Sequence, residues 1–382
     1  MLSRRKFAGL LGAGTLAAKA GGEKFRVYVG TYTRGDSKGI YSFVLDTAAG
    51  TLTPEGLAAE TENPSFLAIH PSGDYVYACN ELDKFKGQDS GGLSAFKADP
   101  VSGKLEKLND VAAGGTSTCH ANISRNGRYV VLANYGSGSC AAFAIGADGK
   151  LGERTAFHQH TGTSVDPGRQ RGPHAHSVNF DRQNKHVIVA DLGLDQVKVY
   201  NFNAATGTMT ANEPAFTKVK PGSGPRHFSF HPSGKYAYVI NEMLCSVTAF
   251  NWNAKKGTLT EIETVTTLPE PVKRGYSTAE VVAHPNGRFL YGSNRGHNTI
   301  AVFQVNAATG KLTTVEHKST QGEVPRNFAI DPTGEFLIAA NQNTHSIVLF
   351  RINQASGALE QVGQPVMAPS PVCVRYIKLR RG

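Results

Sequence analysis

The sequence predicts an all-β fold: one seven-bladed β-propeller with four-stranded blades, closed by a C-terminal strand that joins the N-terminal blade. Two repeated turns and their distribution between the chain ends support this prediction. One turn occurs seven times and the other six times. Repeats of this kind outweigh the length of 382 residues, which alone suggests two or three domains.

The first repeated element is a short Gly-x-apolar turn that leads into a strand. Its copies are spaced 46 to 58 residues apart, which is typical of four-stranded propeller blades. The seven glycines are Gly50, Gly103, Gly149, Gly207, Gly257, Gly310 and Gly357.

The second element is a pair of apolar strands joined by a His/Asp-Pro-Ser-Gly type of turn. Residues 230–238, FHPSGKYAY, show the full form, with proline and glycine placed as in a type I turn. The six copies are centred on Gly73, Gly127, Asn184, Gly234, Gly287 and Gly334. The seventh is split between the chain ends, because residues 25–33 match its second strand and residues 370–379 match its first. Pairing these ends leaves no free sheet edge at the seam.

The N-terminus resembles an export signal. The segment SRRKF at 3–7 precedes a short Gly/Ala-rich run and a small-x-small cleavage site at 18–20, as in twin-arginine signal peptides. We therefore expect residues 1–20 to be removed and residues 21–382 to form the propeller. The expected partner of the leader is the twin-arginine export machinery, and the expected location is periplasmic or secreted, with no membrane segment after cleavage.

Charge and cysteine content narrow the expected partners. The formal charge is +10, and four of the basic residues lie in the expected leader. The remaining excess is spread along the chain, which favours a small anionic molecule over nucleic acid. The five cysteines lack CxxC spacing, so we expect mostly buried thiols, although export would permit one or two disulfides.

Residues near one mouth of the central channel follow from counting along each blade. The two strands of the second element are antiparallel and the first is innermost, so positions eight before and eight after the turn glycine share that mouth. The residues eight before are Ser65, Cys119, His176, Arg226, Ala279 and Arg326. The residues eight after, with the matching residue of the split blade first, are Tyr32, Glu81, Tyr135, Leu192, Glu242, Arg295 and Gln342.

Blades four to six break the repeat at these positions. His176, Arg226, Glu242 and Arg295 stand where small or apolar residues are found in other blades, which favours an anion site there. Neighbouring positions and the loop 158–176 supply further candidates for substrate binding. These are His120, His174, Arg169, His227, Glu280, Arg326 and Tyr135.

Two other polar patterns have structural explanations. An Asn, Asp or Thr ends the second strand in every blade (Thr31, Asn80, Asn134, Asp191, Asn241, Asn294 and Asn341), where such side chains bond nearby backbone. The His158-x-His160 pair has metal-ligand spacing but no third ligand cluster, so we expect no metal and no cofactor.

Five segments carry a family resemblance: GPRHF at 224–228, VINE at 239–242, RQxxPHxH at 169–176, ANYG at 133–136 and SNRGH at 293–297. They resemble the lactonase family of seven-bladed propellers, which includes bacterial 6-phosphogluconolactonases and fungal carboxymuconate-lactonizing cycloisomerases. The likeness covers the whole expected mature chain.

The resemblance implies a catalytic set of His176, Arg226, Glu242 and Arg295, with His174 an alternative to His176. It implies a metal-independent hydrolase for a sugar-acid lactone, similar to 6-phosphogluconolactonase. The export signal departs from the family, because a pentose-phosphate intermediate is cytoplasmic, and this puts a phosphorylated substrate in doubt. A cycloisomerase and a non-catalytic periplasmic ligand-binding propeller are the alternatives.

Overall fold

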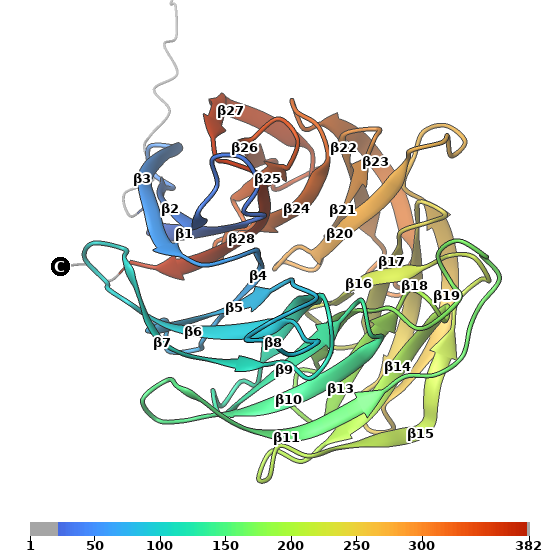
Figure 1. The fold of residues 1–382 in the computed structure, drawn as a ribbon. Helices are drawn as coiled ribbons and strands as arrows, with labels where there is room; N and C mark the ends of the chain where they lie inside the picture. Colours follow the sequence, from blue (N-terminus) through green and yellow to red (C-terminus); the bar gives the residue numbers. More distant parts are fainter. Residues whose placement is uncertain (1–21, 380–382) are drawn as a thin grey trace, which may run out of the picture.

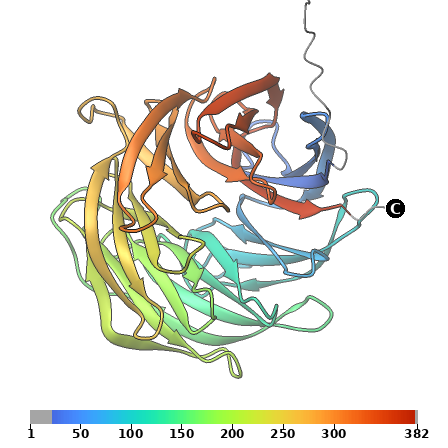
Figure 2. The same ribbon diagram turned by 180° about the vertical axis from the view of Figure 1, so that it is seen from behind.

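Seven four-stranded antiparallel sheets form a ring around a central channel (Figures 1 and 2). The structure is a computed structural model and describes residues 22–379. The predicted all-β fold of seven blades is confirmed. Residues 22–379 contain no helix long and apolar enough to cross a membrane. The predicted leader, residues 1–20, lies outside the described residues.

Blades are numbered from the one that contains the first strand. The innermost strands of blades one to seven are β28 (Pro371–Lys378), β4 (Pro64–Ile69), β8 (Thr118–Ile123), β12 (Ala175–Phe180), β16 (Pro225–Phe230), β20 (Ser277–Ala283) and β24 (Pro325–Ile330). The second strands are β1 (Lys24–Thr31), β5 (Tyr75–Asn80), β9 (Tyr129–Asn134), β13 (His186–Asp191), β17 (Tyr236–Asn241), β21 (Phe289–Arg295) and β25 (Phe336–Asn341).

The two outer layers complete each blade. The third strands are β2 (Gly39–Asp46), β6 (Gly92–Ala98), β10 (Ser139–Ile145), β14 (Gln196–Phe202), β18 (Ser246–Asn253), β22 (Thr299–Val305) and β26 (Ser346–Ile352). The outermost strands are β3 (Thr51–Glu60), β7 (Leu105–Ala112), β11 (Leu151–Gln159), β15 (Met209–Lys218), β19 (Thr258–Thr266), β23 (Leu312–Ser319) and β27 (Leu359–Met367).

The ring closes through the two ends of the chain, as predicted. Strand β28 is the innermost strand of blade one and pairs antiparallel with β1, with Val374 opposite Val29. In Figure 1 the red C-terminal strand therefore lies beside the blue N-terminal strand. Full closure satisfies backbone groups that an open sheet edge would expose.

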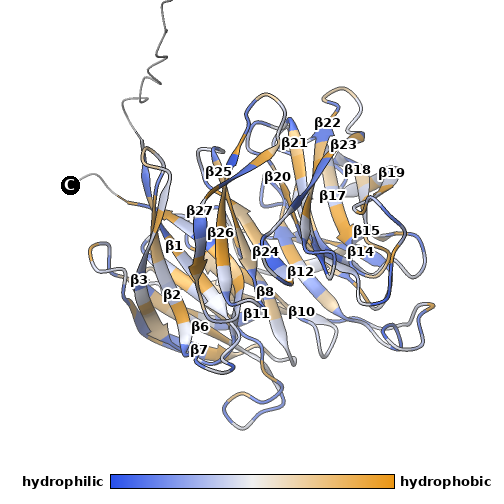
Figure 3. Cartoon of the chain, turned by 90° about the horizontal axis from the view of Figure 1, so that it is seen from above, coloured by the Kyte–Doolittle hydropathy of each residue, from blue (hydrophilic) through white to orange (hydrophobic). Residues whose placement is uncertain are grey.

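The hydrophobic core lies between neighbouring blades. One apolar cluster joins Val197 and Val199 of blade four to Phe250 and Trp252 of blade five. Apolar segments follow the strands, whereas the loops are mostly hydrophilic (Figure 3). Each blade therefore buries its two faces against its neighbours, which holds the channel-lining strands in fixed positions.

The Gly-x-apolar turn joins the third strand to the outermost strand and contacts the preceding blade. Gly310 has a positive φ of 73°, and a Cβ there would lie 2.5 Å from the Tyr236 ring of blade five. The Tyr238 hydroxyl donates to the Gly310 carbonyl at 3.2 Å. Glycine is needed for both its backbone conformation and its missing side chain.

The second repeated turn makes a similar contact. His231 Nε2 donates to the Gly287 carbonyl of the next blade at 2.7 Å, and His284 Nε2 donates to that of Gly334 at 2.8 Å. In blade four Asp181 takes the place of this histidine. A methyl group added at Gly234, the turn glycine of blade five that follows it, would have no neighbour within 4 Å among residues 22–379. The residues repeated in these motifs are therefore the ones that make contacts between neighbouring blades.

Candidate functional site

A β-bulge interrupts every innermost strand near the end where that strand begins, which we call the site mouth of the channel. At each bulge the pairing with the second strand skips a residue, as between Ala175 and Ser177. A bulge re-aims the side chain that it contains. The bulges of blades one to five and seven contain Val372, Ser65, Cys119, His176, Arg226 and Arg326, and that of blade six contains Ala279 and Glu280. Apart from Glu280, these are the positions predicted by counting eight residues before the turn, with Val372 added from the split blade.

Glu242 lies at the centre of a charged cluster at this mouth. Its Oε2 accepts from Arg226 Nε at 3.0 Å and lies 2.9 Å from Arg295 NH2. Its Oε1 accepts from Arg169 NH2 at 2.8 Å. His176 Nε2 lies 4.0 Å from Oε2. The structure therefore brings together the four residues predicted to be catalytic and adds Arg169 to them.

The protonation state of Glu242 is set by these neighbours. Burial alone would raise its pKa, but Arg295, Arg226 and Arg169 outweigh burial and hold the pKa well below its ordinary value. Opposite charges within this range favour the ionised form. Glu242 is therefore a carboxylate at neutral pH.

Arg226 and Arg295 are fixed in place by backbone carbonyls of blade six. Arg226 NH1 donates to the Ala279 carbonyl at 2.6 Å, and Arg295 NH2 donates to that of Thr278 at 2.8 Å. The Arg226 side chain is 2% exposed and that of Arg295 is 14% exposed. Arg295 Nε is buried without a hydrogen-bond partner among the described residues. This guanidinium can donate to a ligand in the channel.

His176 is buried beside the cluster and is uncharged. Burial, followed by Arg226 and His227, lowers its pKa well below the ordinary value. Its Nδ1 lies 3.8 Å from Cys119 Sγ, on the side away from Glu242. The neutral ring presents Nε2 toward the carboxylate, where it can accept or pass on a proton.

A second polar group lies across the channel. Arg326 NH2 donates to the Tyr32 hydroxyl at 2.7 Å, and that hydroxyl donates to both oxygens of Glu81 at 3.0 and 2.9 Å. The counting placed all three at this mouth, but only Arg326 was predicted to bind substrate. Polar and charged side chains at this mouth therefore extend into blades one, two and seven.

The loop between β11 and β12 supplies Arg169 and His174. Arg169 NH2 also donates to the Tyr135 hydroxyl at 3.0 Å. The His174 ring stacks on Tyr135 with centroids 4.5 Å apart, and its Nδ1 donates to the Tyr135 carbonyl. His174 thus lies at the rim and His176 in the channel, so the geometry favours His176 as the histidine nearest Glu242.

The remaining predicted binding residues form a layer deeper in the channel. His227 Nδ1 lies 2.9 Å from Glu280 Oε1, and the His227 ring lies 5.1 Å from His120 and 5.4 Å from His176. His120 Nδ1 accepts from the Val178 backbone of the next blade. A role of this layer in binding substrate stays a prediction.

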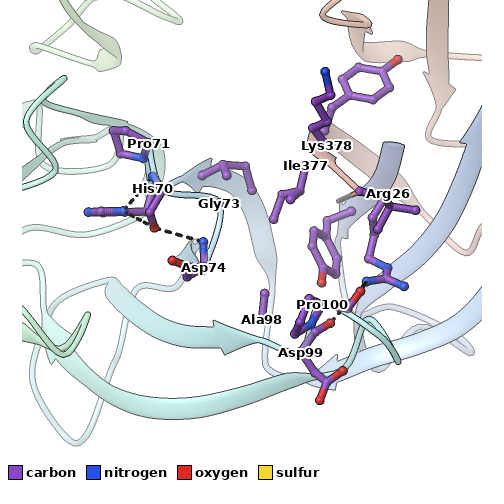
Figure 4. A pocket seen from close by; sticks show the side chains of 15 residues that line it. Arg26, His70, Pro71, Gly73, Asp74, Ala98, Asp99, Pro100, Ile377 and Lys378 are labelled. Atoms are coloured by element: carbon purple, nitrogen blue, oxygen red, sulfur yellow. Dashed lines mark hydrogen bonds between the residues drawn. The ribbon is translucent and has the colours of Figure 1, made fainter. Parts of the chain in front are cut away.

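Three cavities among the described residues show which side chains a small molecule could contact. One of about 490 Å³ at the site mouth is lined by Tyr32, Glu81 and Arg326. Another, at the opposite end of the channel, reaches His120 and Glu280 and includes Arg375. A third hollow lies between blades one and two and contains none of the predicted site residues (Figure 4).

Arg26, which lines the hollow in Figure 4, has a structural role. Its guanidinium pairs with Glu55 and donates to the carbonyls of Asp99, Pro100 and Val101 in blade two. These bonds occupy the guanidinium on both edges. They join the closing blade to its neighbour.

The polar residues that end the second strands, and His160 of the His158-x-His160 pair, bond other parts of the fold. Asn294 Nδ2 donates to the Thr267 carbonyl and Asn341 Nδ2 to that of Thr320, and all seven strand-end residues are buried. His160 bonds Asp191 at 2.5 Å and the Tyr200 hydroxyl at 3.0 Å. Within residues 22–379 no three His, Cys, Asp or Glu side chains form a group that could hold a metal ion. All five cysteines are buried and free, so neither permitted disulfide is formed.

The charge at the site mouth suits an anion. The positions found by counting eight residues before and after the turn, together with Arg169, carry four guanidinium groups and two carboxylates. The guanidinium groups are those of Arg169, Arg226, Arg295 and Arg326, and the carboxylates are those of Glu81 and Glu242. Guanidinium groups bind carboxylate and phosphate oxygens through paired hydrogen bonds. The fold and site define a seven-bladed propeller with an arginine-rich cluster around Glu242 at one end of its channel.

Comparison with known proteins assigns the family. Residues 26–376 match the family described as "Lactonase, 7-bladed beta-propeller", and the chain belongs to this family. It is 38% identical over 354 residues to a 6-phosphogluconolactonase of Bacillus subtilis, a match that covers 93% of this chain and 99% of the relative. It is 35% identical over 309 residues to a 6-phosphogluconolactonase of Formosa agariphila, covering 80% of this chain and 86% of the relative.

A solved structure extends this similarity. The periplasmic gluconolactonase of Pseudomonas aeruginosa superimposes with a TM-score of 0.86 at 32% identity, covering 94% of this chain and 100% of the other. The predicted family resemblance is confirmed.

Proposed function

We propose that this protein hydrolyses a sugar-acid lactone, after export, with Glu242, His176, Arg226 and Arg295 as its catalytic residues and without a bound metal. Two similar proteins are named 6-phosphogluconolactonase, and a similar solved structure is named a periplasmic gluconolactonase. Cell fractionation of the full chain would test the export. The observation that carries the proposal is the Glu242 carboxylate, with His176 Nε2 4.0 Å from it and buried arginines on its other sides.

The reaction needs a proton acceptor for water and donors for a developing oxyanion. In our mechanism the water oxygen bonds to the lactone carbonyl carbon while Glu242 takes the water proton. Arg295 and Arg226 donate to the carbonyl oxygen, where one pre-placed donor is worth roughly 3 kcal/mol. The bond from the carbonyl carbon to the ring oxygen then breaks, and His176 passes the proton to that oxygen. The product is the open hydroxy acid.

The test is a hydrolysis assay with gluconolactone, its 6-phosphate and a muconolactone, corrected for spontaneous ring opening. Glu242→Gln keeps the shape of the side chain and is expected to lower kcat by about a hundredfold or more, because the water proton loses its acceptor. Arg226→Ala should lower kcat/KM by a similar factor of about a hundredfold. Glu106→Gln, on the exposed face of β7, is the matched control and should keep wild-type rates.

Labelled water distinguishes hydrolysis from the alternatives. Hydrolysis places one solvent oxygen in the product carboxylate, whereas a cycloisomerase places none. Wild-type rates in both site variants would contradict the assignment of the site. Tight binding of a lactone without turnover would instead support a non-catalytic propeller.

A further inference from the structure

Glu242 Oε1, the oxygen that faces the rim, is bound by Arg169. The other oxygen, Oε2, is bound by Arg226 and faces Arg295. Oε1 accepts from Arg169 NH2 at 2.8 Å. In the proposed reaction the carboxylate must accept a proton from water, and a guanidinium already bonded to it opposes this. The arrangement therefore holds Glu242 in a weakly basic state.

Arg169 differs from the two other arginines in how it is held. Its side chain is 45% exposed, against 2% for Arg226 and 14% for Arg295. Its guanidinium bonds two side chains, those of Glu242 and Tyr135, whereas Arg226 and Arg295 also bond backbone carbonyls. Moving the Arg169 side chain thus breaks fewer fixed contacts.

The backbone of this loop is firmly held, so only the side chain needs to move. Gln170 is buried and donates to the Leu192 carbonyl at 2.9 Å. Its Oε1 accepts from the Asp166 backbone at 3.0 Å, and the Asp166 carboxylate accepts from the backbone of Arg169 at 2.8 Å. A long exposed arginine on such a base can reorient through its rotamers within nanoseconds.

We propose that Arg169 selects anionic lactones by exchanging its bond to Glu242 Oε1 for a bond to the carboxylate or phosphate of the substrate. This proposal rests on the proposed function and deepens it. The exchange frees Oε1 to accept the proton of the attacking water. A lactone without a charged group leaves Arg169 on Glu242 and is turned over more slowly.

The test replaces Arg169 and compares two lactones of the same skeleton, 6-phosphogluconolactone and gluconolactone. In Arg169→Gln, kcat/KM for the phosphorylated lactone should fall by about tenfold or more, the scale of one charge-assisted hydrogen bond. For the uncharged lactone kcat should rise or stay the same, because Oε1 is free from the start. Arg169→Lys keeps the charge, so its kcat/KM for the phosphorylated lactone should lie between that of the wild type and that of Arg169→Gln.

The matched control is Arg171→Gln. Arg171 lies on the same loop, is exposed, and its Nε donates to the Pro167 carbonyl within that loop. It should leave both lactones at wild-type rates. A purely structural role of Arg169 would lower both rates by one factor, and that result, or no change in either, would overturn the proposal.

The pH profile gives a second measure. The charged and titratable groups that face Glu242 are Arg169 of the loop, His176 of β12, Arg226 of β16, Arg295 of β21, Arg326 of β24 and the Cys245 thiol of the β17–β18 turn. Removing one cation from this set should move the acid limb of kcat/KM to higher pH in Arg169→Gln and not in Arg171→Gln.

A wild-type protein that hydrolyses no lactone would refute the proposed function instead. The selection can then still be measured by calorimetry as binding of 6-phosphogluconolactone, which is charged, against gluconolactone, which is not. Arg169→Gln should weaken the first by about tenfold and leave the second within about twofold. Equal loss for both ligands would overturn the selective role of Arg169.

Discussion

Glu242 shows what could and could not be predicted for a single residue. Its place at the site mouth follows from counting eight residues past Gly234, because the second strand begins at the same distance from the turn in each of blades two to seven. Its bond to Arg169 joins residues 73 positions apart through a loop outside the repeat. Comparison between blades gives no position for such a loop, so sequence reasoning could only group Arg169 with the rim.

Tyr32 and Glu81 show a second kind of limit. Both were placed at the site mouth, yet neither was predicted to take part in the site. The hydrogen bonds of the Tyr32 hydroxyl to Glu81 and to Arg326 depend on side-chain direction across the channel. The charge of Glu81 and of Arg326 at these counted positions was the available indication.

The pH dependence of activity follows from the charges around Glu242 and His176. The three arginines hold the pKa of Glu242 below its ordinary value of 4.5, and burial holds that of His176 below 6.5. Neither group changes its charge between pH 5.5 and 8. We expect kcat/KM, corrected for spontaneous hydrolysis, to vary by less than about threefold over that range. A limb near pH 6.5 would show instead that His176 titrates near its ordinary value.

At the scale of elements, the bulges explain why the site lies where the innermost strands begin. Each bulge turns one side chain of an otherwise regular strand toward the channel, and the ring of bulges includes His176 and Arg226. The spacing in sequence revealed these positions without revealing the bulges. Counting succeeded because a bulge recurs at the same place in every blade.

The seven repeated glycines are the sequence feature that most clearly predicts the blades. Their recurrence from blade to blade follows from contact with the preceding blade, as at Gly310 against Tyr236. The contact between Gly310 and the Tyr236 ring could not be assigned from sequence, because the two residues lie 74 positions apart in the chain.

Alanine at Gly310 tests this contact. Gly310→Ala and Gly234→Ala introduce the same methyl group at nearly equal φ, 73° and 72°, but only the first meets a ring, at 2.5 Å. We expect Gly310→Ala to reduce the free energy of unfolding by about 1–3 kcal/mol more than Gly234→Ala does, the usual cost of overpacking. Urea unfolding of the two variants measures the difference. Equal losses would mean that φ alone requires glycine at Gly310.

At the scale of the whole molecule, the ring was predictable and the channel's contents were only partly so. The missing seventh turn predicted the closing strand, and β28 pairs with β1 as expected. The counting addressed one end of the channel. The cavity at the opposite end is lined by all seven innermost strands and includes Arg375, which was outside every predicted set. Which end binds the sugar acid is therefore the central question for the molecule.

A crystal structure with bound gluconate or 6-phosphogluconate answers that question most directly. We predict the sugar-acid carboxylate at the site mouth, within hydrogen-bonding distance of Arg295 and beside Glu242, because the Arg295 side chain is 14% exposed there and lies in a cluster of three arginines. A sugar acid held at the opposite end of the channel, against Arg375 and away from Glu242, would contradict the proposed site.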